Sequence, residues 1–288
     1  MKKKIALVGG CGFIGHNLAI ALKNCGYDPV IIDSLSVNNL LSFNDSTVEN
    51  KKLYLGILNN RIDILNEKNI KIIVRDAKNF NELNQALLDI NPDKIVHLSA
   101  VSHANISNLR PKYTFDNSLV TLQNTLDFAK NKKTHVIYLS SSMVYGDFDQ
   151  DEVTEESKLK PMGIYGNLKL SGEILIKTYN QVFDLPYTII RPSALYGERC
   201  VSRRVGQIFI ENALQDKVIN IKGDGEDRLD FTYIDDFVQG VKLSLEKKGA
   251  INETFNITYG SSRTIKDMYN ILSKEFKNLN VKFEEREK

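Results

Sequence analysis

A tyrosine and a lysine four residues apart could form a proton-transfer pair. Tyr165 and Lys169 lie in "GIYGNLKLSGE", residues 163–173, within a stretch that has a helical pattern. Four residues make about one helical turn, so the two side chains would leave the same face about 6 Å apart. A phenol held beside an ammonium could take up and return a proton, because the cation stabilises the phenolate. With 12 tyrosines in a lysine-rich chain, about one such pair is expected by chance, so only its context can decide.

A glycine-rich turn follows the first apolar run. In "VGGCGFIG", Gly9, Gly12 and Gly15 have the spacing GxxGxxG. A turn without Cβ atoms lets backbone N–H groups and the positive end of a helix approach a pyrophosphate. Asp33 ends the next apolar run, "VIID". A carboxylate there could accept hydrogen bonds from both hydroxyls of an adenosine ribose and would repel a 2′-phosphate, so the two features favour an NAD site over an NADP site.

Length and composition are those of an ordinary soluble globular protein. The chain has 288 residues, 42% hydrophobic and 26% charged, and its net charge of +2 gives no electrostatic reason to expect nucleic acid or an anionic membrane surface as a partner. The first apolar run, "IALV", is too short for a signal peptide, and no stretch approaches the length of a membrane span. The three cysteines have no CxxC spacing and the four histidines no ligand spacing. We therefore expect a cytoplasmic protein with reduced thiols and no metal site.

Short apolar runs alternate with longer amphipathic stretches through most of the chain. This alternation predicts an α/β fold of the Rossmann type, a doubly wound parallel sheet with helices on both faces. The predicted strands are 4–8, 30–32, 71–74, 94–98, 135–139 and 187–190, with a further candidate at 281–283. The predicted helices are 13–25, 52–68, 80–90, 112–131 and 165–184.

Two parts of the chain depart from this alternation. Segment 37–69 carries a loop and an extra helix whose role no motif explains. After residue 190 the elements shorten, and clusters of glycine and charge occur. We therefore expect an NAD-binding Rossmann domain at 1–190 and a smaller C-terminal substrate-binding lobe at 191–288. The lobe could exchange elements with the first domain and could be incomplete at its C-terminal end.

Seven motifs occur in order between residues 8 and 236: "GGCGFIG", "VRDAKN", "IVHLSA", "YLSSSMVYG", "YGNLK", "RPSALYGER" and "GDGEDRLDFTYIDD". Together they resemble the extended short-chain dehydrogenase/reductases, specifically the NAD-dependent sugar-nucleotide epimerase/dehydratase family. Seven matching segments are far more specific than one, so the Tyr–Lys pair is interpreted as catalytic. The resemblance implies an NAD-dependent enzyme that acts on a nucleotide-diphosphate sugar. It also implies a homodimer formed through the outer faces of helices 112–131 and 165–184.

The resemblance further implies roles for individual residues. Ser141, Tyr165 and Lys169 match the catalytic hydroxyl, phenol and ammonium. Arg228 matches an arginine that grips the substrate diphosphate, and Arg199 is a second candidate for that charge. The substrate-contacting positions are Ser142, Met143, Arg199 and Arg228. The NAD-contacting positions, besides Tyr165 and Lys169, are Gly9, Gly12, Phe13, Ile14, Gly15, Asp33, Ser34, Asp76, Ala77, Leu98, Ser99, Ala100 and Asn117.

The chemistry that the resemblance implies is transient oxidation of the sugar at C4, with return of the hydride to the opposite face. A free tyrosine has a pKa near 10 and is a poor base at neutral pH. Lys169 and the positive nicotinamide ring would lower the pKa of Tyr165 towards about 7, a change of roughly 4 kcal/mol. Tyr165 would then take the proton of a sugar hydroxyl while Ser141 holds the same oxygen by a hydrogen bond. Lys169 would also hold the nicotinamide ribose.

The residues after Ser141 favour an epimerase. In the family that the chain resembles, dehydratases carry an Asp–Glu pair there and decarboxylases tend to carry an acid. This chain has Ser142 and Met143, and a thioether cannot exchange protons. The alternatives are an NAD(P)-dependent sugar-nucleotide dehydrogenase or a keto-sugar reductase; a dehydratase, a decarboxylase and a non-catalytic NAD-binding protein are disfavoured. The pair Arg203 and Arg204 fits either a diphosphate contact or an ordinary charged surface.

Overall fold

A seven-stranded sheet forms the centre of the molecule. The computed structural model describes residues 2–44, 48–148, 150–277 and 279–285. The strand order is β11-β6-β5-β4-β1-β2-β3, and all neighbouring strands in this sheet are parallel. The strands are β1 (Lys4–Val8), β2 (Asp28–Asp33), β3 (Lys71–Val74), β4 (Lys94–His97), β5 (His135–Leu139), β6 (Tyr187–Pro192) and β11 (Glu253–Ile257). The order reverses between β1 and β4, as in a Rossmann fold, so the predicted fold class is confirmed.

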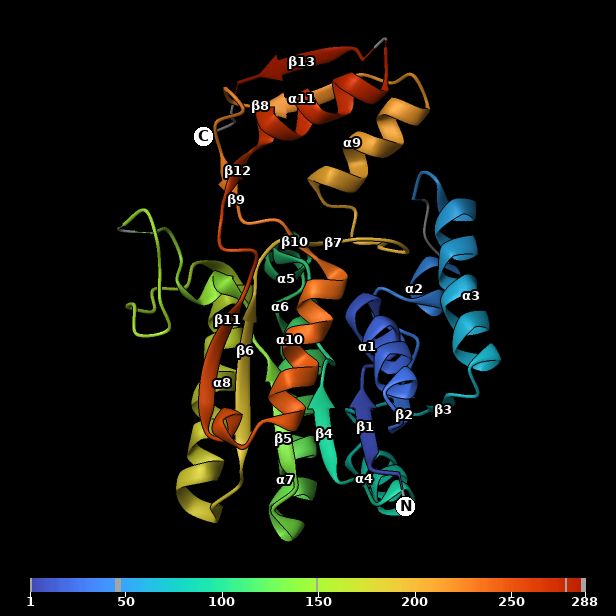
Figure 1. Cartoon of the computed structure of the whole chain (residues 1–288), viewed down its shortest axis with the longest axis vertical. Coiled ribbons are helices and arrows are strands. Elements are labelled where there is room, and N and C mark those ends of the chain that lie inside the picture. Colours follow the sequence, from blue (N-terminus) through green and yellow to red (C-terminus); the bar gives the residue numbers. More distant parts are fainter. Residues whose placement is uncertain (1, 45–47, 149, 278, 286–288) are drawn as a thin grey trace.

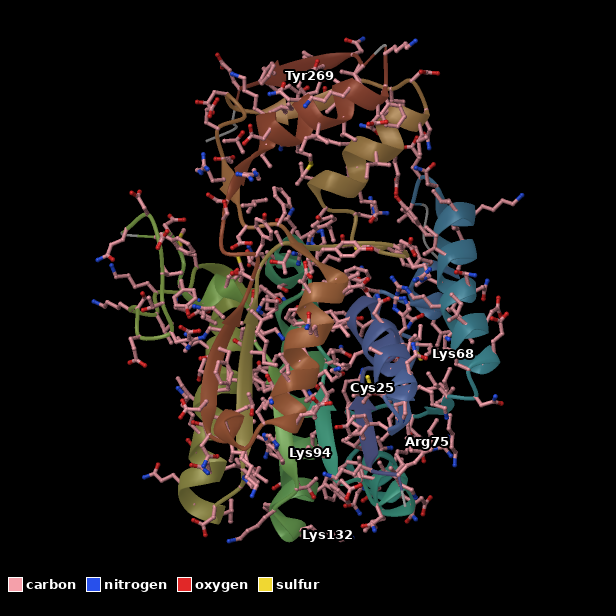
Figure 2. All side chains as sticks on the ribbon, viewed as in Figure 1. Cys25, Lys68, Arg75, Lys94, Lys132 and Tyr269 are labelled. Carbon is pink, nitrogen blue, oxygen red and sulfur yellow. The ribbon has the colours of Figure 1, made fainter. Side chains whose placement is uncertain are left out.

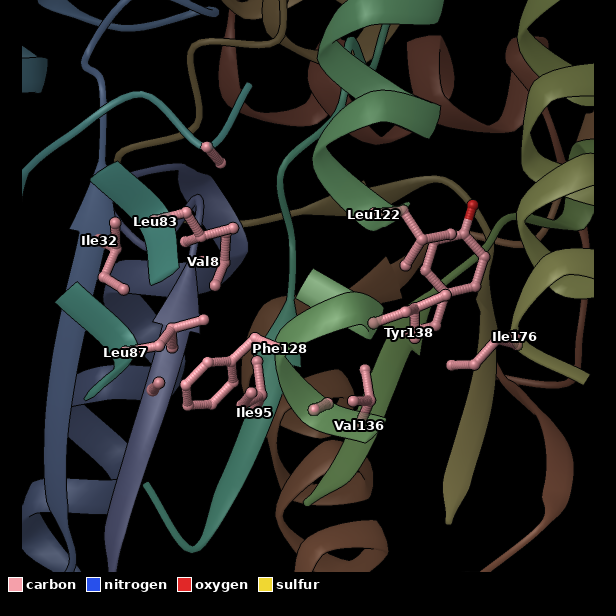
Figure 3. Packing of buried hydrophobic residues seen from close by; sticks show 14 of the residues in the cluster. Val8, Ile32, Leu83, Leu87, Ile95, Leu122, Phe128, Val136, Tyr138 and Ile176 are labelled. Carbon is pink, nitrogen blue, oxygen red and sulfur yellow. The ribbon is translucent and has the colours of Figure 1, made fainter. Parts of the chain in front are cut away.

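Helices cover both faces of this sheet (Figure 1). One face carries α1 (Phe13–Asn24) and α10 (Ile234–Glu246), and the other carries α4 (Phe80–Ile90), α7 (Thr121–Lys132) and α8 (Gly163–Phe183). Because side chains alternate along a strand, β1 buries Ile5 and Leu7 against the first pair of helices and Ala6 and Val8 against the other three. Figure 3 shows the second of these cores, where Phe128 of α7 packs beside Ile95 of β4. Burial on both faces explains why the strands are continuous apolar runs.

The carboxyl ends of the strands face a smaller lobe. In Figure 2, Lys94 at the amino end of β4 and Tyr269 on α11 (Ile265–Glu275) lie at opposite ends of the molecule. The lobe pairs two parallel strands and packs them on two helices around a core of its own. Its elements are α9 (Val205–Leu214), β8 (Ile219–Lys222), α11 (Ile265–Glu275) and β13 (Val281–Glu284).

Short strand pairs connect the lobe to the sheet. The pairs are β7 (Leu195–Tyr196) with β10 (Thr232–Tyr233), and β9 (Arg228–Leu229) with β12 (Arg263–Thr264). Both α10 and β11 follow residue 190 in the chain but pack on the large sheet. The chain therefore enters the lobe, returns to the sheet for these two elements and enters the lobe again. The division at residue 190 stays a prediction.

A π-helical segment interrupts the helix predicted at 112–131. The chain forms α6 (Pro111–Phe115), then the π segment (Asp116–Val120), and then α7. Such turns are frequent at functional sites. This one carries Asn117, whose buried side chain donates to the carbonyl oxygen of Tyr113 at 2.8 Å. Other short helices are α5 (Ala104–Leu109) and the 3₁₀ segments Ser142–Val144 and Lys248–Ala250.

The extra segment 37–69 forms α2 (Leu40–Asn44) and α3 (Lys51–Glu67), which confirms the helix expected at 52–68. Residues 45–47 of this segment lie outside the described residues. Tyr54 and Leu58 of α3 pack with Phe43 of α2 and with Val201, which lies in the loop before α9. The extra helix therefore lies between the edge of the sheet at β2 and β3 and the smaller lobe (Figure 1).

Candidate active site

The predicted dinucleotide site lies at the carboxyl ends of β1 and β4, where the strand order reverses. Open α/β sheets bind their ligands in the crevice at such a point. Gly9 has a φ of +83°, and a Cβ there would lie 2.6 Å from the backbone nitrogen of Ser99. A Cβ on Gly15 would lie 2.4 Å from the carbonyl oxygen of Gly10. A Cβ on Gly12 would meet only a carbonyl oxygen at 3.5 Å, so the turn is open at the start of α1 and fits a pyrophosphate.

Asp33 lies beside this glycine turn, at the end of β2. Its carboxylate accepts the N–H of Cys11 at 2.8 Å and the N–H of Leu35 at 2.7 Å. Burial raises the pKa of Asp33, whereas these two hydrogen bonds and the charge of Arg61 act in the opposite direction. Each carboxylate oxygen accepts one backbone N–H and can accept a further donor, as ribose hydroxyls would require.

Most of the other predicted NAD contacts lie at the same edge of the sheet. Asp76 follows β3 and accepts the N–H of Lys78 at 2.9 Å. The N–H of Leu98 donates to the carbonyl oxygen of Val8 at 2.8 Å, so the loop after β4 runs beside the glycine turn. Asn117 lies farther along, in the π segment that packs on α8. The remaining predicted positions at this edge are Phe13 and Ile14 in α1, Ser34 after β2, Ala77 before α4, and Ser99 and Ala100 after Leu98.

Ser141, Tyr165 and Lys169 come together in the structure. Ser141 lies just after β5, Tyr165 and Lys169 lie one turn apart on α8, and all three side chains are buried. The Ser141 hydroxyl lies near enough to the Tyr165 hydroxyl to lower its pKa. The Nζ atom of Lys169 lies 5.9 Å from the centre of the Tyr165 ring. A phenol, a hydroxyl and an ammonium thus form one buried group that could bind a hydroxyl or carbonyl oxygen and move its proton.

Lys169 is held by the end of β5. Its Nζ atom donates to the carbonyl oxygen of Leu139 at 2.6 Å and lies 5.3 Å from the centre of the Tyr138 ring. Burial lowers the pKa of Lys169 to about 8, and the carboxylate of Glu173 acts in the opposite direction. Lys169 therefore remains charged at neutral pH, but its pKa lies only slightly above neutral pH.

The sequence-based expectation for the pKa of Tyr165 concerns the NAD-bound protein and stays a prediction. Burial raises this pKa, while the Arg204 guanidinium and the Ser141 hydroxyl act to lower it. The expectation assigned the lowering effect to Lys169 and the nicotinamide ring. In the chain alone, burial outweighs both lowering effects, so Tyr165 is a neutral phenol at neutral pH.

Arg204, which sequence analysis left open between a contact and a surface charge, faces the site. Its Nη2 atom donates to the carbonyl oxygen of Ser102, in the loop after β4, at 2.8 Å. Burial lowers the pKa of His103, and the charges of Arg204 and Arg203 lower it further. The loop before α9 therefore brings positive charge across the carboxyl edge of the sheet. Spacing could not reveal this, because only the course of that loop brings Arg204 near Tyr165.

A buried ion pair that sequence analysis missed lies beside the group of Ser141, Tyr165 and Lys169. Glu173 accepts hydrogen bonds from the Ser140 hydroxyl at 2.5 Å, from Arg191 Nε at 2.9 Å and from Arg191 Nη2 at 2.7 Å. Arg191 also donates from Nη1 to the Tyr145 hydroxyl at 2.7 Å. Ser140 precedes the catalytic hydroxyl and Glu173 lies one turn after Lys169, so this pair joins β5, β6 and α8. The only sequence signal that could have pointed to Glu173 is its position one helical turn after Lys169.

Ser142 and Met143 begin the 3₁₀ turn that follows Ser141. The backbone N–H of Met143 donates to the Ser141 hydroxyl oxygen at 3.2 Å. The Met143 side chain is 41% exposed, so it points towards solvent rather than into the core. These two predicted substrate contacts therefore lie next to Ser141, the predicted catalytic hydroxyl.

The two predicted substrate arginines lie apart from each other. Arg199 contacts the helix of the glycine turn, where its Nε atom donates to Nε2 of His16 at 3.3 Å. Arg228 lies on β9, and it donates to the hydroxyl and the carbonyl oxygen of Ser262 at 2.8 and 3.0 Å. The structure thus connects Arg199 to the dinucleotide crevice, and Arg228 stands in the strand pair that leads into the smaller lobe.

Three further features of the described residues are the state of their thiols, the arrangement of their potential metal ligands and the character of their helices. Cys11 is buried, Cys200 is half-buried and Cys25 is exposed, and all three are free thiols. In these ranges, no three His, Cys, Asp or Glu side chains gather as metal ligands would. No helix in them has the length and apolar character needed to cross a lipid bilayer.

The fold and the site define an α/β protein with a dinucleotide crevice and a serine–tyrosine–lysine group at its edge. Residues 5–258 match the NAD dependent epimerase/dehydratase family, and the chain belongs to this family. A Bacillus subtilis protein named as an uncharacterized UDP-glucose epimerase, YtcB, is 33% identical over 88% of this chain and 76% of its own length. The dTDP-glucose 4,6-dehydratase of Haemophilus influenzae is 29% identical over 90% of this chain and 75% of its own length.

A solved structure is similar to this chain in its three-dimensional fold as well as in its sequence. The UDP-glucuronic acid 4-epimerase of Bacillus cereus, in complex with UDP-glucuronic acid and NAD, matches with a TM-score of 0.86 and 31% identity, over 98% of this chain and 86% of that chain. The predictions of the family, of an enzyme and of NAD as cofactor are confirmed. Both epimerases and dehydratases occur among the relatives, so the reaction has to be inferred from the site.

Proposed function

We propose that the chain is an NAD-dependent 4-epimerase of a nucleotide-linked sugar. The observation that carries the proposal is the composition of the catalytic group. Ser141, Tyr165 and Lys169 are assembled and buried, yet the neighbouring turn offers Ser142 and Met143 where elimination of water would need an acid and a base. A thioether neither donates nor accepts a proton, so the site is equipped for reversible oxidation alone.

The substrate class is a nucleoside-diphosphate sugar. The B. cereus epimerase was solved with UDP-glucuronic acid, which supports a UDP-sugar. The charges that favour such a ligand here are Arg204 near Tyr165 and Arg228 at the entrance to the lobe. Guanidinium groups suit phosphate because they donate in a planar fork.

Three side chains would handle the proton at the sugar hydroxyl. Ser141 would donate a hydrogen bond to the sugar oxygen and hold it against Tyr165. With NAD bound, the positive nicotinamide ring and Lys169 would favour the phenolate of Tyr165, which would accept the hydroxyl proton and return it after the sugar turns over in the site. Lys169, charged at neutral pH and one helical turn away, would stabilise the phenolate. NAD, when bound, supplies the group that accepts and returns the hydrogen of the sugar carbon.

The glycine turn and the strand ends would hold the dinucleotide. The turn at Gly9, Gly12 and Gly15 would bind the pyrophosphate, and the two carboxylate oxygens of Asp33 would bind the adenosine ribose. Since NAD is regenerated in each turnover, an epimerase needs no added oxidant. This distinguishes it from a dehydrogenase or a reductase on the same fold.

The purified protein, without added NAD, should be tested on a panel of UDP-, GDP-, CDP- and dTDP-sugars by proton NMR. Inversion at C4 is expected for at least one of them. Loss of water would show a dehydratase, and net consumption of added NAD or NADH together with product formation would show a dehydrogenase or a reductase. Either result would refute the epimerase.

Tyr165→Phe should still bind NAD but lose turnover by about 10²- to 10⁴-fold, because the proton acceptor is removed. Tyr179→Phe is a matched control: this tyrosine lies on the same helix, with its hydroxyl bound to Asp127 at 3.0 Å. Full activity of Tyr165→Phe would contradict the assigned proton transfer.

We also propose a homodimer formed through the outer faces of α8 and of the helical stretch from α6 to α7. Ile174 and Val182 of α8 are 59% and 62% exposed, and Phe115 at the end of α6 is 47% exposed. Apolar side chains on neighbouring helices suit a helix–helix interface. Light scattering should give a dimer for the wild type and a monomer for Ile174→Lys; a monomeric wild type would refute it. A cytoplasmic location stays a prediction.

A further inference from the structure

Arg61 of α3 is among the largest fully buried side chains of the described residues, with 2% exposure. Its Nε and Nη2 atoms donate to the carbonyl oxygen of Arg199 at 3.0 and 2.5 Å. The partner is thus a backbone carbonyl rather than a carboxylate, although burying a guanidinium is costly unless its charge is compensated. Burial lowers the pKa of Arg61 to about 10, so its charge remains at neutral pH.

The charge of Arg61 lies close to the glycine turn. It acts on the pKa values of Cys11 in the turn, of His16 in α1 and of Asp33 at the end of β2. The positive end of α1 points into the same region. The Asp33 carboxylate raises the pKa of Arg61, and a dinucleotide pyrophosphate bound at the turn would bring further negative charge towards the same guanidinium.

His16 completes a chain of contacts from the turn to Arg199. Its Nδ1 atom is 3.0 Å from the carbonyl oxygen of Gly12, and its Nε2 atom accepts from Arg199 Nε at 3.3 Å. This pattern assigns a neutral imidazole that donates from Nδ1. Burial, and then the charge of Arg61, lower the pKa of His16 to about 3, which agrees with that assignment. Gly12, His16, Arg199 and Arg61 are therefore connected in series.

The other end of α3 holds α9, the first helix of the smaller lobe. Glu211 of α9 accepts from the Tyr54 hydroxyl at 2.6 Å and from the Asn50 side chain at 3.1 Å. Gln215 at the end of α9 donates to Asn50 at 2.9 Å. The loop 197–204, between Arg61 and α9, carries Val201 into the apolar cluster of α2 and α3. Thus α3 contacts both this loop and α9, the helix that follows the loop.

We propose that α3 couples the binding of a dinucleotide at the glycine turn to the ordering of loop 197–204 and α9, which would hold the nucleotide sugar. The coupling depends on the contacts that Arg61 and Tyr54 of α3 make. Arg61 is a positioning residue in this proposal, since it acts through Arg199. A bound pyrophosphate favours the buried position of Arg61, and this position holds the loop that carries Arg204. The coupling is reciprocal, so a nucleotide in the lobe strengthens dinucleotide binding. The substrate part of this inference rests on the proposed function.

The coupling can be measured by the change in NADH fluorescence on binding. NADH is titrated with and without saturating UDP. In the wild type, UDP should tighten NADH binding about tenfold. In Arg61→Met this factor should fall to about one, and Arg61→Lys, which keeps the charge, should restore part of it. Lys52→Met, which removes an exposed charge from the same helix, is the control and should keep the wild-type factor.

A second variant and a second readout separate coupling from simple unfolding. Tyr54→Phe removes only the hydroxyl that binds Glu211 and should reduce the coupling factor without unfolding the protein. Trypsin can cleave loop 197–204 at Arg199, Arg203 and Arg204. NADH should slow cleavage there in the wild type and in Lys52→Met, but not in Arg61→Met.

The result that overturns the proposal is a coupling factor of one in the wild type, or an unchanged factor in both Arg61→Met and Tyr54→Phe. These measurements use only NADH and UDP, so they stand even if no epimerase activity is found. If a substrate is found, Arg61→Met should raise its KM about tenfold and leave kcat within about threefold. A loss of kcat alone would show instead that Arg61 acts on the chemical step.

Discussion

Replacing Glu173 by glutamine tests whether the buried ion pair beside the group of Ser141, Tyr165 and Lys169 supports this group. The carboxylate accepts three hydrogen bonds, one from Ser140 and two from Arg191, and both charged side chains are about 2% exposed or less. Glutamine keeps the shape, but its amide nitrogen has to face a donor of Arg191, because only one oxygen remains. Arg191 would then stay buried without a counter-charge.

The expected loss of stability follows from this geometry. Removing one partner of a buried ion pair costs about 3–5 kcal/mol, because the other charge is left uncompensated. For a chain of this size, each kcal/mol lowers Tm by about 2–4 °C. Glu173→Gln should therefore lower Tm by about 6–20 °C. The catalytic residues should feel the change too, since Glu173 raises the pKa of Lys169.

Thermal melting followed by circular dichroism measures the first effect, and the pH dependence of kcat/KM measures the second. The alkaline limb should move to lower pH in Glu173→Gln, because Lys169 loses the carboxylate that keeps it charged. Glu226→Gln is the control: Glu226 forms an exposed ion pair with Lys266 at 3.6 Å, so Tm should change by about 1 °C or less. A Glu173→Gln protein that melts within about 1 °C of the wild type would refute the reasoning.

Three further predictions concern the glycine turn, two buried histidines and Lys169. Gly9→Ala should abolish NADH binding or prevent folding, because its Cβ would lie 2.6 Å from the backbone nitrogen of Ser99; unchanged NADH titrations would contradict this. Burial lowers the pKa values of His16 and His97 to about 3, so below about pH 6.5 the unfolded chain binds more protons and Tm should fall as pH drops towards 3. A Tm that stays constant from pH 7 to 4.5 would disprove it. The wild-type rate should decline above about pH 8, where Lys169 loses its charge, and initial rates that stay level to pH 10 would exclude this role.

Local pattern was enough to predict most of the large sheet. The strands at 4–8 and 71–74 and the helix at 80–90 occur at the predicted residues, because fully buried strands and amphipathic helices have distinct periods. The break at Asp116–Val120 was not predicted, since a π turn leaves the apolar spacing of the helix almost unchanged. The return of β11 to the sheet was also missed, because strand pairing over long sequence distance leaves no local signal.

Some residues of the candidate site could likewise be predicted from local spacing, and others could not. Tyr165 and Lys169 could be paired from the sequence because they share one helix, and Gly9 and Asp33 because each ends a neighbouring strand. By contrast, Arg204 fitted either a diphosphate contact or an ordinary charged surface, and Arg61 had no sequence signal at all. Their positions depend on where the smaller lobe and α3 pack, which no spacing records.

The sequence by itself determined the order of elements, the glycine turn and the phenol–ammonium spacing, because each depends on residues within a few positions of one another. Only the tertiary structure decided which buried charges face one another: Glu173 with Arg191, Arg204 near Tyr165, and Arg61 between the glycine turn and the lobe. The physical reason is that charge interactions depend on distance and burial, and both arise only when distant segments pack together.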